Sequence, residues 1–557
     1  MENTRLFLVT AWFVVLLLLY QAWQADYGGT KTPAPQTADT PDSLAGKTVT
    51  GGASDIPNTA TGNSSPKPQE AGIAKFTQTS KTVAVNTDNY RLRIDLRGAG
   101  ITKAELVNFP VSIEKPDQAF VLLDNTEDLL FITQGGLLSK SDAPTHISDY
   151  RTEQEAYSLA ADQSVLEVPF LWSTESGLVV RKIYEFRRGE YQIGVRYEIS
   201  NQGAGPWTGQ SYSQFKRNNP GRTSMFGSYT YTGAVISSPE TRYKKISFKD
   251  MQKQELQQDV VNGWVAMIQH YFITALIPEH KNSVYHYYTK EQADGNFAIG
   301  AVTPTVTVAP GTTQIIQELM YIGPKIHKIL ENTADGLELT VDYGALWFIA
   351  KPLFWCLSQL HELTHNWGWS IILVTVILKL IFFPLSATSY RSMADIRKLQ
   401  PRLMSIRERY QNDKARLNQE MTKIYKEEKI NPLGGCLPIL LQTPVFLALY
   451  WVLLETVEMR QSGFIFWLHD LSSPDPYYVL PVLMGITMFI QQKLSPAPPD
   501  PVQARVMTIM PIMFTVLLFF LQSGLVLYQV VNSTLSIMQQ WFITRKLDSS
   551  GPQPKKS

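Results

Sequence analysis

Residues 367–384 read WGWSIILVTVILKLIFFP and carry a single charge, the lysine at position 379. This run is close in length to the stretch of about 20 apolar residues that an α-helix needs to cross the hydrocarbon core of a membrane. A charged side chain at mid-span costs on the order of 2.5–3.5 kcal/mol, so it normally faces protein or water. The stretch therefore predicts a membrane span whose lysine is either ion-paired or functional.

Working outward from this stretch, further apolar runs follow it, and one more stands near the N-terminus. The predicted spans are Leu6–Trp23, Trp367–Leu385, Leu437–Leu454, Tyr477–Gln491, Met507–Leu521 and Leu525–Ile543. We interpret residues 1–25 as an uncleaved anchor, because Tyr20 and Trp23 stand where a signal peptidase needs small residues. The sequence thus predicts a polytopic α-helical membrane protein with six spans.

The distribution of positive charge predicts the orientation of these spans. Residues 390–429 hold eleven Lys and Arg, and the tail 546–557 is also basic. Positively charged loops stay in the cytoplasm, so both termini are predicted to be cytoplasmic and the segment after the first span external. Residues 386–430 predict a cytoplasmic helical hairpin. Its basic face would bind ribosomal RNA or anionic lipid, or would simply be solvated.

The predicted external segment has two parts. Residues 26–82 are rich in Gly, Pro, Ser, Thr and Ala and predict a disordered linker. In residues 83–330, apolar and polar residues alternate, as in Tyr191–Ile199, which is typical of half-buried strands. Arg188-Gly189-Glu190 predicts a hairpin turn. We expect a large periplasmic β-sandwich for docking or scaffolding, with a sugar-binding cleft as the alternative.

Composition narrows the functional classes. The chain is 18% charged with a net charge of +1, which argues against a generally basic nucleic-acid-binding protein. Two cysteines exclude a disulfide-rich scaffold and a four-cysteine zinc site. No phosphate-binding loop of the G-x-x-x-x-G-K-[ST] type is present, and no cofactor is predicted.

Residues 341–365 predict an amphipathic helix at the membrane interface, which ends in His361-Glu362-Leu363-Thr364-His365. This H-E-x-x-H pattern is typical of zinc metalloproteases, where both histidines bind zinc and the glutamate acts as base. A third ligand is required. The downstream Asn431–Gly435 segment lacks an acid and is predicted on the other side of the membrane. We therefore predict neither a metal site nor a catalytic site.

Lys379 has few candidate acidic partners, because the predicted spans offer only Glu455, near an outer end. Without such a partner, the lysine suggests a wet cavity that receives some other molecule. The other polar residues that would line this cavity are Thr375, Gln442, Tyr528, Gln529 and Asn532. A secondary transporter would use the same lysine but normally shows inverted repeats, and none is found.

Short motifs in the right order make the chain resemble the YidC-type membrane protein insertases of Gram-negative bacteria. The motifs are Val341-Asp342-Tyr343-Gly344, Asn366-Trp367-Gly368, Asn431-Pro432-Leu433-Gly434-Gly435-Cys436, Asp475-Pro476-Tyr477-Tyr478, Leu480-Pro481-Val482-Leu483-Met484-Gly485 and Ser523-Gly524-Leu525-Val526-Leu527-Tyr528. Together they cover most of residues 341–545. The resemblance implies an insertase and chaperone rather than an enzyme, located in the bacterial inner membrane.

The same resemblance implies a core of five transmembrane helices, residues 366–545, around a hydrophilic groove open to the cytoplasm and to lipid. Thr375, Gln442 and Tyr528 match groove-lining positions, and Lys379 stands where the family usually has arginine. The implied partners are nascent membrane proteins, the Sec translocon and membrane lipids. The ribosome and the signal-recognition-particle receptor would bind the hairpin and the basic tail. The external domain is expected to resemble sugar mutarotases without their activity.

Overall fold

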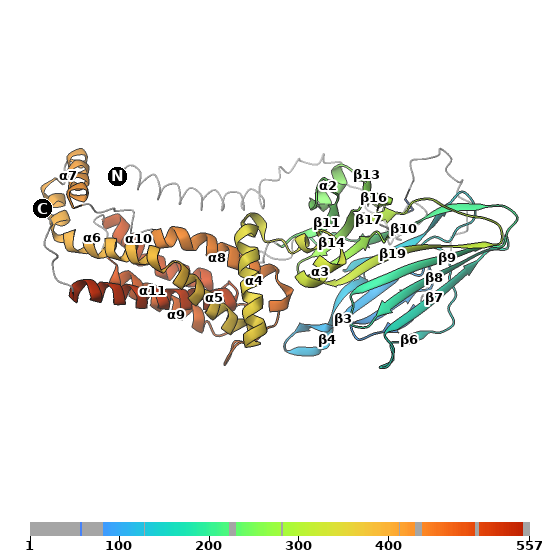
Figure 1. Cartoon of the computed structure of the whole chain (residues 1–557), viewed down its shortest axis with the longest axis horizontal. Helices are drawn as coiled ribbons and strands as arrows, with labels where there is room; N and C mark the ends of the chain where they lie inside the picture. The colour runs from blue at the N-terminus through green and yellow to red at the C-terminus, as the bar shows by residue number, and fades with distance from the viewer. Residues whose placement is uncertain are drawn as a thin grey trace, which may run out of the picture. The chain divides into compact units, whose positions relative to one another are not determined.

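The computed structural model describes residues 56–57, 82–126, 128–221, 230–279, 282–410, 413–428, 437–495 and 501–549. The predicted anchor 1–25, most of the linker 26–82 and the end of the tail 546–557 lie outside these ranges. Two compact units are present (Figure 1). We call the described parts of Val49–Gly344 with Trp451–Ser462 the β unit. Those of Ala345–Tyr450 and Gly463–Ser557 form the helical unit.

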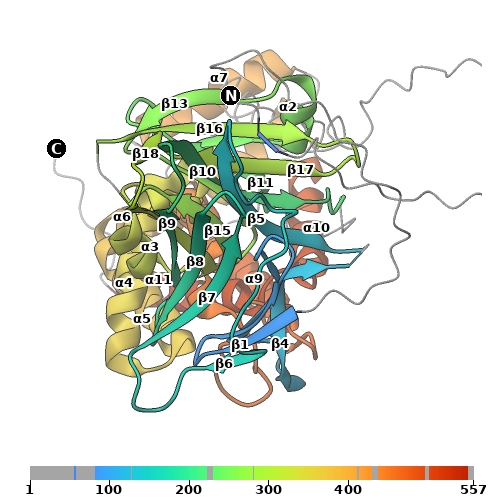
Figure 2. The same cartoon turned by 90° about the vertical axis from the view of Figure 1, so that its right-hand side faces the viewer.

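The β unit contains two large sheets. The first has the strand order β13 (Gln257–Val261), β16 (Val284–Glu291), β17 (Phe297–Val302), β10 (Trp207–Arg217), β5 (Leu130–Ser139), β4 (Lys115–Asn125), β3 (Ile101–Ser112), β2 (Tyr90–Asp95), β1 (Thr82–Asn86) and β6 (Ala156–Ser158), with β18 (Val306–Val308) beside β10. The second has the order β12 (Lys244–Ile246), β11 (Thr232–Ser237), β14 (Trp264–Gln269), β15 (Phe272–Ile277), β19 (Thr312–Pro324), β9 (Gln192–Asn201), β8 (Leu178–Arg187) and β7 (Val165–Ser173). Figure 2 shows β7, β8 and β9 side by side.

The predicted hairpin around Gly189 is confirmed, since β8 and β9 pair antiparallel and Gly189 adopts a φ of 74° between them. The alternation in β9 follows the two faces of its sheet. Val195 and Tyr197 are fully buried, whereas Arg196 and Glu198 lie on the outer face. Period two in the sequence therefore identified a strand that is buried on one side only.

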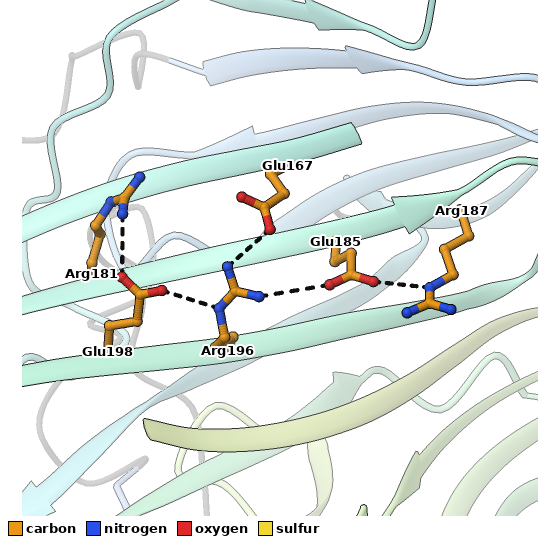
Figure 3. Close-up of polar contacts among 6 residues, drawn as sticks. All are labelled: Glu167, Arg181, Glu185, Arg187, Arg196 and Glu198. Carbon is orange, nitrogen blue, oxygen red and sulfur yellow. Dashed lines mark hydrogen bonds and ion pairs between the residues drawn. The ribbon is translucent and has the colours of Figure 1, made fainter. Parts of the chain in front are cut away.

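The outer face of β7, β8 and β9 carries a chain of ion pairs (Figure 3). Arg196 is at its centre, with its guanidinium 2.9 Å from Glu167, 3.2 Å from Glu198 and 3.7 Å from Glu185. Arg181 and Arg187 extend the chain at either end, at 3.2 and 2.9 Å from Glu198 and Glu185. Exposed pairs contribute about 0–1 kcal/mol each, so this network marks a solvent-facing surface more than it holds the fold together.

Side-chain hydrogen bonds join the inner faces of the two sheets. The Glu318 carboxylate of β19 accepts hydrogen bonds from Ser211 and Ser213 of β10. The Tyr184 hydroxyl of β8 donates to the Ala99 carbonyl at 2.6 Å. Large side chains such as Trp264 are also buried in this unit. Because the β unit contains no cysteine, burial and these satisfied polar groups hold it together.

The β unit is interrupted in the sequence, which differs from the continuous domain 83–330 that we expected. Trp451–Ser462, at and after the end of α8 (Leu437–Glu455), belongs to it. Val457 and Met459 of the short 3₁₀ helix η5 (Val457–Met459) are 2% and 0% exposed. The other part of this unit ends at Gly344, more than a hundred residues earlier in the chain.

Short helices complete the β unit, namely α2 (Phe248–Lys253), α3 (His327–Thr333) and η2 (Leu337–Thr340), with η3 (Gly344–Leu346) at the junction. Besides α8, the helical unit consists of α4 (Trp347–Thr364), α5 (Trp367–Ile381), α6 (Phe383–Arg409), α7 (Lys414–Glu427), α9 (Val479–Leu494), α10 (Pro501–Leu518) and α11 (Ser523–Ser549). Each predicted span after the first coincides with one of these helices in its greater part. Within this unit, α11 packs against α5, α6 and α9.

Within the described residues, no single helix is both long enough and apolar enough to cross a membrane by itself. One pair, α5 and α6, satisfies these criteria together and is bent by 66° at Phe382. Pro384 explains the break, because proline at the second position of α6 has no N–H to continue the hydrogen-bond ladder from α5.

Helices α6 and α7 form the helical hairpin that the sequence predicted for residues 386–430. Leu403 of α6 is buried against Met421 and Ile424 of α7, and partly buried apolar residues of both helices surround them. Asp413 caps the start of α7 by accepting a hydrogen bond from the Arg416 backbone N–H at 3.0 Å. Gln411 and Asn412, between the two helices, lie outside the described residues.

Burial raises the pKa of the Glu458 carboxyl from 4.5 to about 7. This acid therefore stays protonated in the folded protein at pH values where it ionises in the unfolded chain. Its contribution to stability is complete below pH 4.5 and is lost as the pH rises through 7. The shift corresponds to about 3 kcal/mol.

We predict that Glu458→Gln removes this pH dependence, because glutamine stays neutral and keeps an acceptor for the His327 backbone N–H. The free energy of unfolding of the β unit in the full chain is measured by limited proteolysis in urea at several pH values between 4.5 and 8. The variant should gain up to about 3 kcal/mol on the wild type as the pH rises. Parallel curves for the two proteins would contradict the assignment.

Candidate functional site

The candidate site is built on one face of α11. Asn532, Ser536 and Gln540 follow one another at intervals of four residues, which places their side chains on the same side of the helix. Each of them is only 4% exposed. A line of buried polar side chains in an otherwise apolar helix needs hydrogen-bond partners on the helices packed against it.

Lys379 of α5 meets this polar line. Its ammonium donates a hydrogen bond to the Ser536 hydroxyl at 2.6 Å. The same hydroxyl donates to the Asn532 carbonyl at 2.8 Å, and Tyr390 of α6 also hydrogen-bonds to Ser536. One serine thus connects three helices and holds the lysine at a fixed position.

No carboxylate forms an ion pair with Lys379 in the part of the chain that the structure describes. Glu455, the only acid that the sequence offered as a partner, is instead 2.8 Å from Lys325 in the β unit. The contact of Lys379 with Ser536 is a charge-to-neutral hydrogen bond, which leaves the positive charge uncompensated by these groups. An ammonium has three N–H donors, and one hydroxyl satisfies only one of them.

A second polar contact joins α8 to α11. The Gln442 amide donates to the Gln529 side-chain carbonyl at 3.3 Å, and both residues are half-buried. The predicted residues Gln442, Gln529 and Asn532 therefore do lie along α11 or against it. On the same helix, the Gln540 side-chain oxygen is buried without a hydrogen-bond partner among the described residues.

Two predicted site residues are less directly involved. Thr375 is 1% exposed, and its hydroxyl donates to the Ile371 carbonyl of its own helix at 2.6 Å. Tyr528 is 2% exposed on α11. The recorded hydrogen bonds join neither residue to Lys379. They stay predicted site residues, placed on the two helices that carry Lys379 and Ser536.

Sequence reasoning missed Ser536, Tyr390 and Gln540. A signal for two of them was present, because Ser536 and Gln540 continue the four-residue spacing from Asn532. Tyr390 had no such signal. It is placed by the bend between α5 and α6, which no local pattern specified.

The outer surfaces of the neighbouring helices are strongly apolar. Helices α9 and α10 expose large side chains, among them Leu483, Ile486, Phe489, Ile509, Ile512, Met513, Val516 and Leu517. Contiguous apolar surface of this kind is unusual for a monomer in water and is typical of contact with lipid or protein.

The two histidines of the H-E-x-x-H pattern differ in backbone conformation. His365 ends α4 in the left-handed conformation with a φ of 52°, so it leaves the helical face that would align it with His361. The His361 ring stacks on Trp367, with ring centroids 4.1 Å apart. Among the described residues, no three His, Cys, Asp or Glu side chains are grouped to hold one ion.

We predict that the double substitution His361→Ala and His365→Ala leaves the insertion activity that the sequence resemblance implies within about twofold of wild type. The stacking of His361 on Trp367 is worth only about 0.5–1.5 kcal/mol at a partly exposed position. Insertion assays with purified protein, together with metal analysis of the wild type, check this. Stoichiometric zinc in the wild type with abolished insertion in the variant would contradict it.

Comparison with known proteins defines the class. Residues 82–356 match the family model described as the YidC periplasmic domain, and residues 359–550 match the 60Kd inner membrane protein model. The protein is therefore of the inner-membrane class with a β-rich periplasmic domain and a helical C-terminal part.

Curated relatives identify the family. The chain is 45% identical over 553 residues to the membrane protein insertase YidC of Nitrosococcus oceani, covering 99% of this chain and 100% of that protein. It is 44% identical over 558 residues to the protein of the same name from Methylococcus capsulatus, covering 99% of each. The chain belongs to the YidC family of membrane protein insertases, which are not enzymes.

One solved structure, of an active YidC insertase with its first transmembrane domain resolved, is similar at 21% sequence identity. The similarity covers 83% of this chain and 92% of that one, with a TM-score of 0.38.

Proposed function

We propose that this insertase works through a hydrophilic groove whose central charge is Lys379. Thr375, Gln442, Tyr528, Gln529 and Asn532 line the groove, and Ser536 and Tyr390 hold the lysine in it. Nascent membrane proteins are the clients. A client enters from the cytoplasm, its polar tail is hydrated in the groove, and its apolar helix leaves sideways into lipid.

The observation that carries this proposal is the hydrogen bond from Lys379 to a neutral hydroxyl, without a carboxylate ion pair among the described residues. The buried lysines of the β unit have stronger acceptors, a carboxylate for Lys325 and two backbone carbonyls for Lys182. The remaining N–H donors of Lys379 suit water and the acidic side chains of a client tail.

The driving force for release is the apolar segment of the client. Each CH₂ group moved from water into lipid gains about 0.8 kcal/mol. The exposed apolar faces of α9 and α10 support direct contact of the helical unit with lipid. No nucleotide is required, because lateral partition of one helix of about 20 apolar residues outweighs the cost of its polar tail.

For topology, we propose six spans with both termini in the cytoplasm. The helices α5, α8, α9, α10 and α11 form the five-span core, and α4 lies at the interface. The bent pair α5 and α6 supports the first span of this core and its continuation into the hairpin. Eleven positive charges in residues 390–429 favour a cytoplasmic hairpin.

We also propose that the hairpin and the basic tail bind the ribosome, the signal-recognition-particle receptor and anionic lipid. The chain would act alone or beside the Sec translocon. The exposed positive side chains of α6 and α7, such as Arg397 and Lys423, support a contact with phosphate groups.

We predict a graded effect of substitutions at Lys379. Lys379→Arg should keep insertion near wild type, because charge and reach are retained. Lys379→Ala should slow clients with acidic external tails by about tenfold, since one charge-assisted hydrogen bond is worth about 1.5–3 kcal/mol. Lys379→Glu should be slowest, because it repels those acids. Clients with neutral tails should be affected least by the alanine change.

The measurement is the initial insertion rate into proteoliposomes, divided by the amount of insertase, for matched clients with acidic and neutral tails. Lys493 at the end of α9, whose ammonium lies 5.4 Å from the Phe489 ring, is the matched control for loss of a lysine. Lys493→Ala should not change the ratio between the two clients. An abundant Lys379→Ala variant that inserts acidic-tailed clients at the wild-type rate would rule out the groove charge.

A further inference from the structure

The segment Trp451–Ser462 is bound to the β unit by contacts from several strands, and its first residues are the last turn of α8. We call Leu454–Gln461 the α8 plug. Its charged groups Glu455, Glu458 and Arg460 all point to partners in the β unit. A segment that only connected two helices would need none of them.

The strongest of these contacts is the ion pair between Lys325 and Glu455. The Lys325 ammonium is 2.8 Å from the Glu455 carboxylate and 3.2 Å from the Thr340 carbonyl. The two side chains are 2% and 6% exposed. Both charges are thus removed from water and depend on each other.

Further contacts fix the plug on either side of this pair. His270 donates from Nε2 to the Leu454 carbonyl at 2.9 Å. Burial lowers the pKa of His270 to about 4, so the neutral ring serves as the donor. The Leu454 carbonyl is one of those that a helix end leaves without an intrahelical partner, and the β unit supplies the missing donor.

The far end of the plug is held by Arg460. Its guanidinium donates to the Pro110 carbonyl at 2.8 Å and to the Val111 carbonyl at 3.2 Å. It also lies 5.8 Å from the ring centroid of Phe120 and 5.9 Å from that of Phe272. The plug therefore contacts the β3–β4 hairpin, β15 and the segment after β19.

We propose that Lys325 and Glu455 are a positioning pair that fixes the last turn of α8, the helix that also carries Gln442. This rests on the proposed function, because Gln442 is a groove residue there. The insertase depends on the β unit through this contact, and ion pairs elsewhere in the domain do not affect insertion.

The chain offers a matched control. Lys216 of β10 is 2.7 Å from Asp294, and their side chains are 7% and 14% exposed. This pair resembles Lys325–Glu455 in length and burial, but both of its members belong to the continuous part of the β unit. Lys216→Met and Lys325→Met each leave one buried acid without its cation.

The test uses the full chain in proteoliposomes. Lys325→Met and Glu455→Gln should each lower the insertion rate per molecule about tenfold or more, because breaking a buried pair leaves an uncompensated charge. Lys325→Arg should keep most of the activity. The double substitution Lys325→Met with Glu455→Met should restore the protease resistance of the β unit but not the insertion rate, because no buried charge remains and no ion pair fixes the end of α8. Lys216→Met should insert at the wild-type rate.

Protease resistance of the β unit, measured on the same samples, separates positioning from unfolding. If Lys325→Met makes the domain protease-sensitive, the insertion rates of Glu455→Gln and of the double variant test the proposal instead. Wild-type insertion by Glu455→Gln with an intact domain would overturn the proposal. So would an equal loss in Lys216→Met.

The outcome is independent of the groove charge. Normal insertion by Lys379→Ala alongside slow insertion by Glu455→Gln would refute the groove and keep the positioning pair. Slow insertion by Lys379→Ala alongside normal insertion by Glu455→Gln would refute the positioning pair and keep the groove charge.

Discussion

A buried ammonium group needs acceptors for its hydrogens, and this need shapes both units of the chain. Lys325 has a carboxylate and a carbonyl. Lys182 of β8 has the carbonyls of Ala99 and Gly98, at 2.8 and 3.4 Å, and burial lowers its pKa to about 7. Lys379 has one serine hydroxyl. The three lysines differ in how much of their charge the protein itself compensates.

These differences separate structural from functional charge. A buried ion pair adds little net stability but is costly to break, so it fixes geometry well. Such a pair suits a contact that must keep the end of α8 in one place. A lysine held by a neutral group retains its attraction for other anions. Placing a charged group in an apolar helix costs free energy. Such a charge is found where it has a function, as we propose for Lys379.

Much of the architecture was readable from local patterns. Alternation identified β9, Arg188-Gly189-Glu190 identified its hairpin, and the helical hairpin predicted for residues 386–430 is formed by α6 and α7. The position of Lys379 in an apolar helix was also evident. These features depend on neighbours within a few residues, which is the range over which periodicity carries information.

The interaction partners of the charged side chains could not be predicted from the sequence in the same way. Glu455 was considered for Lys379 because both stand in apolar runs, yet its partner Lys325 lies 130 residues away in the β unit. Ser536 is an ordinary small polar residue until the packing of α5 on α11 brings Lys379 to it. Long-range contacts of this kind depend on the whole fold, so a single sequence specifies them only through the completed packing.

Because the β unit is interrupted in the sequence, part of its core comes from a segment late in the chain. Residues 345–450 lie between its two parts, so the apolar side chains of Val457 and Met459 and the carboxylate of Glu455 follow the rest of the core in the chain. Until the end of α8 reaches the β unit, Lys325 has only the Thr340 carbonyl as an acceptor, and its burial is uncompensated. Stability of this part of the domain therefore depends on the end of α8 being in place.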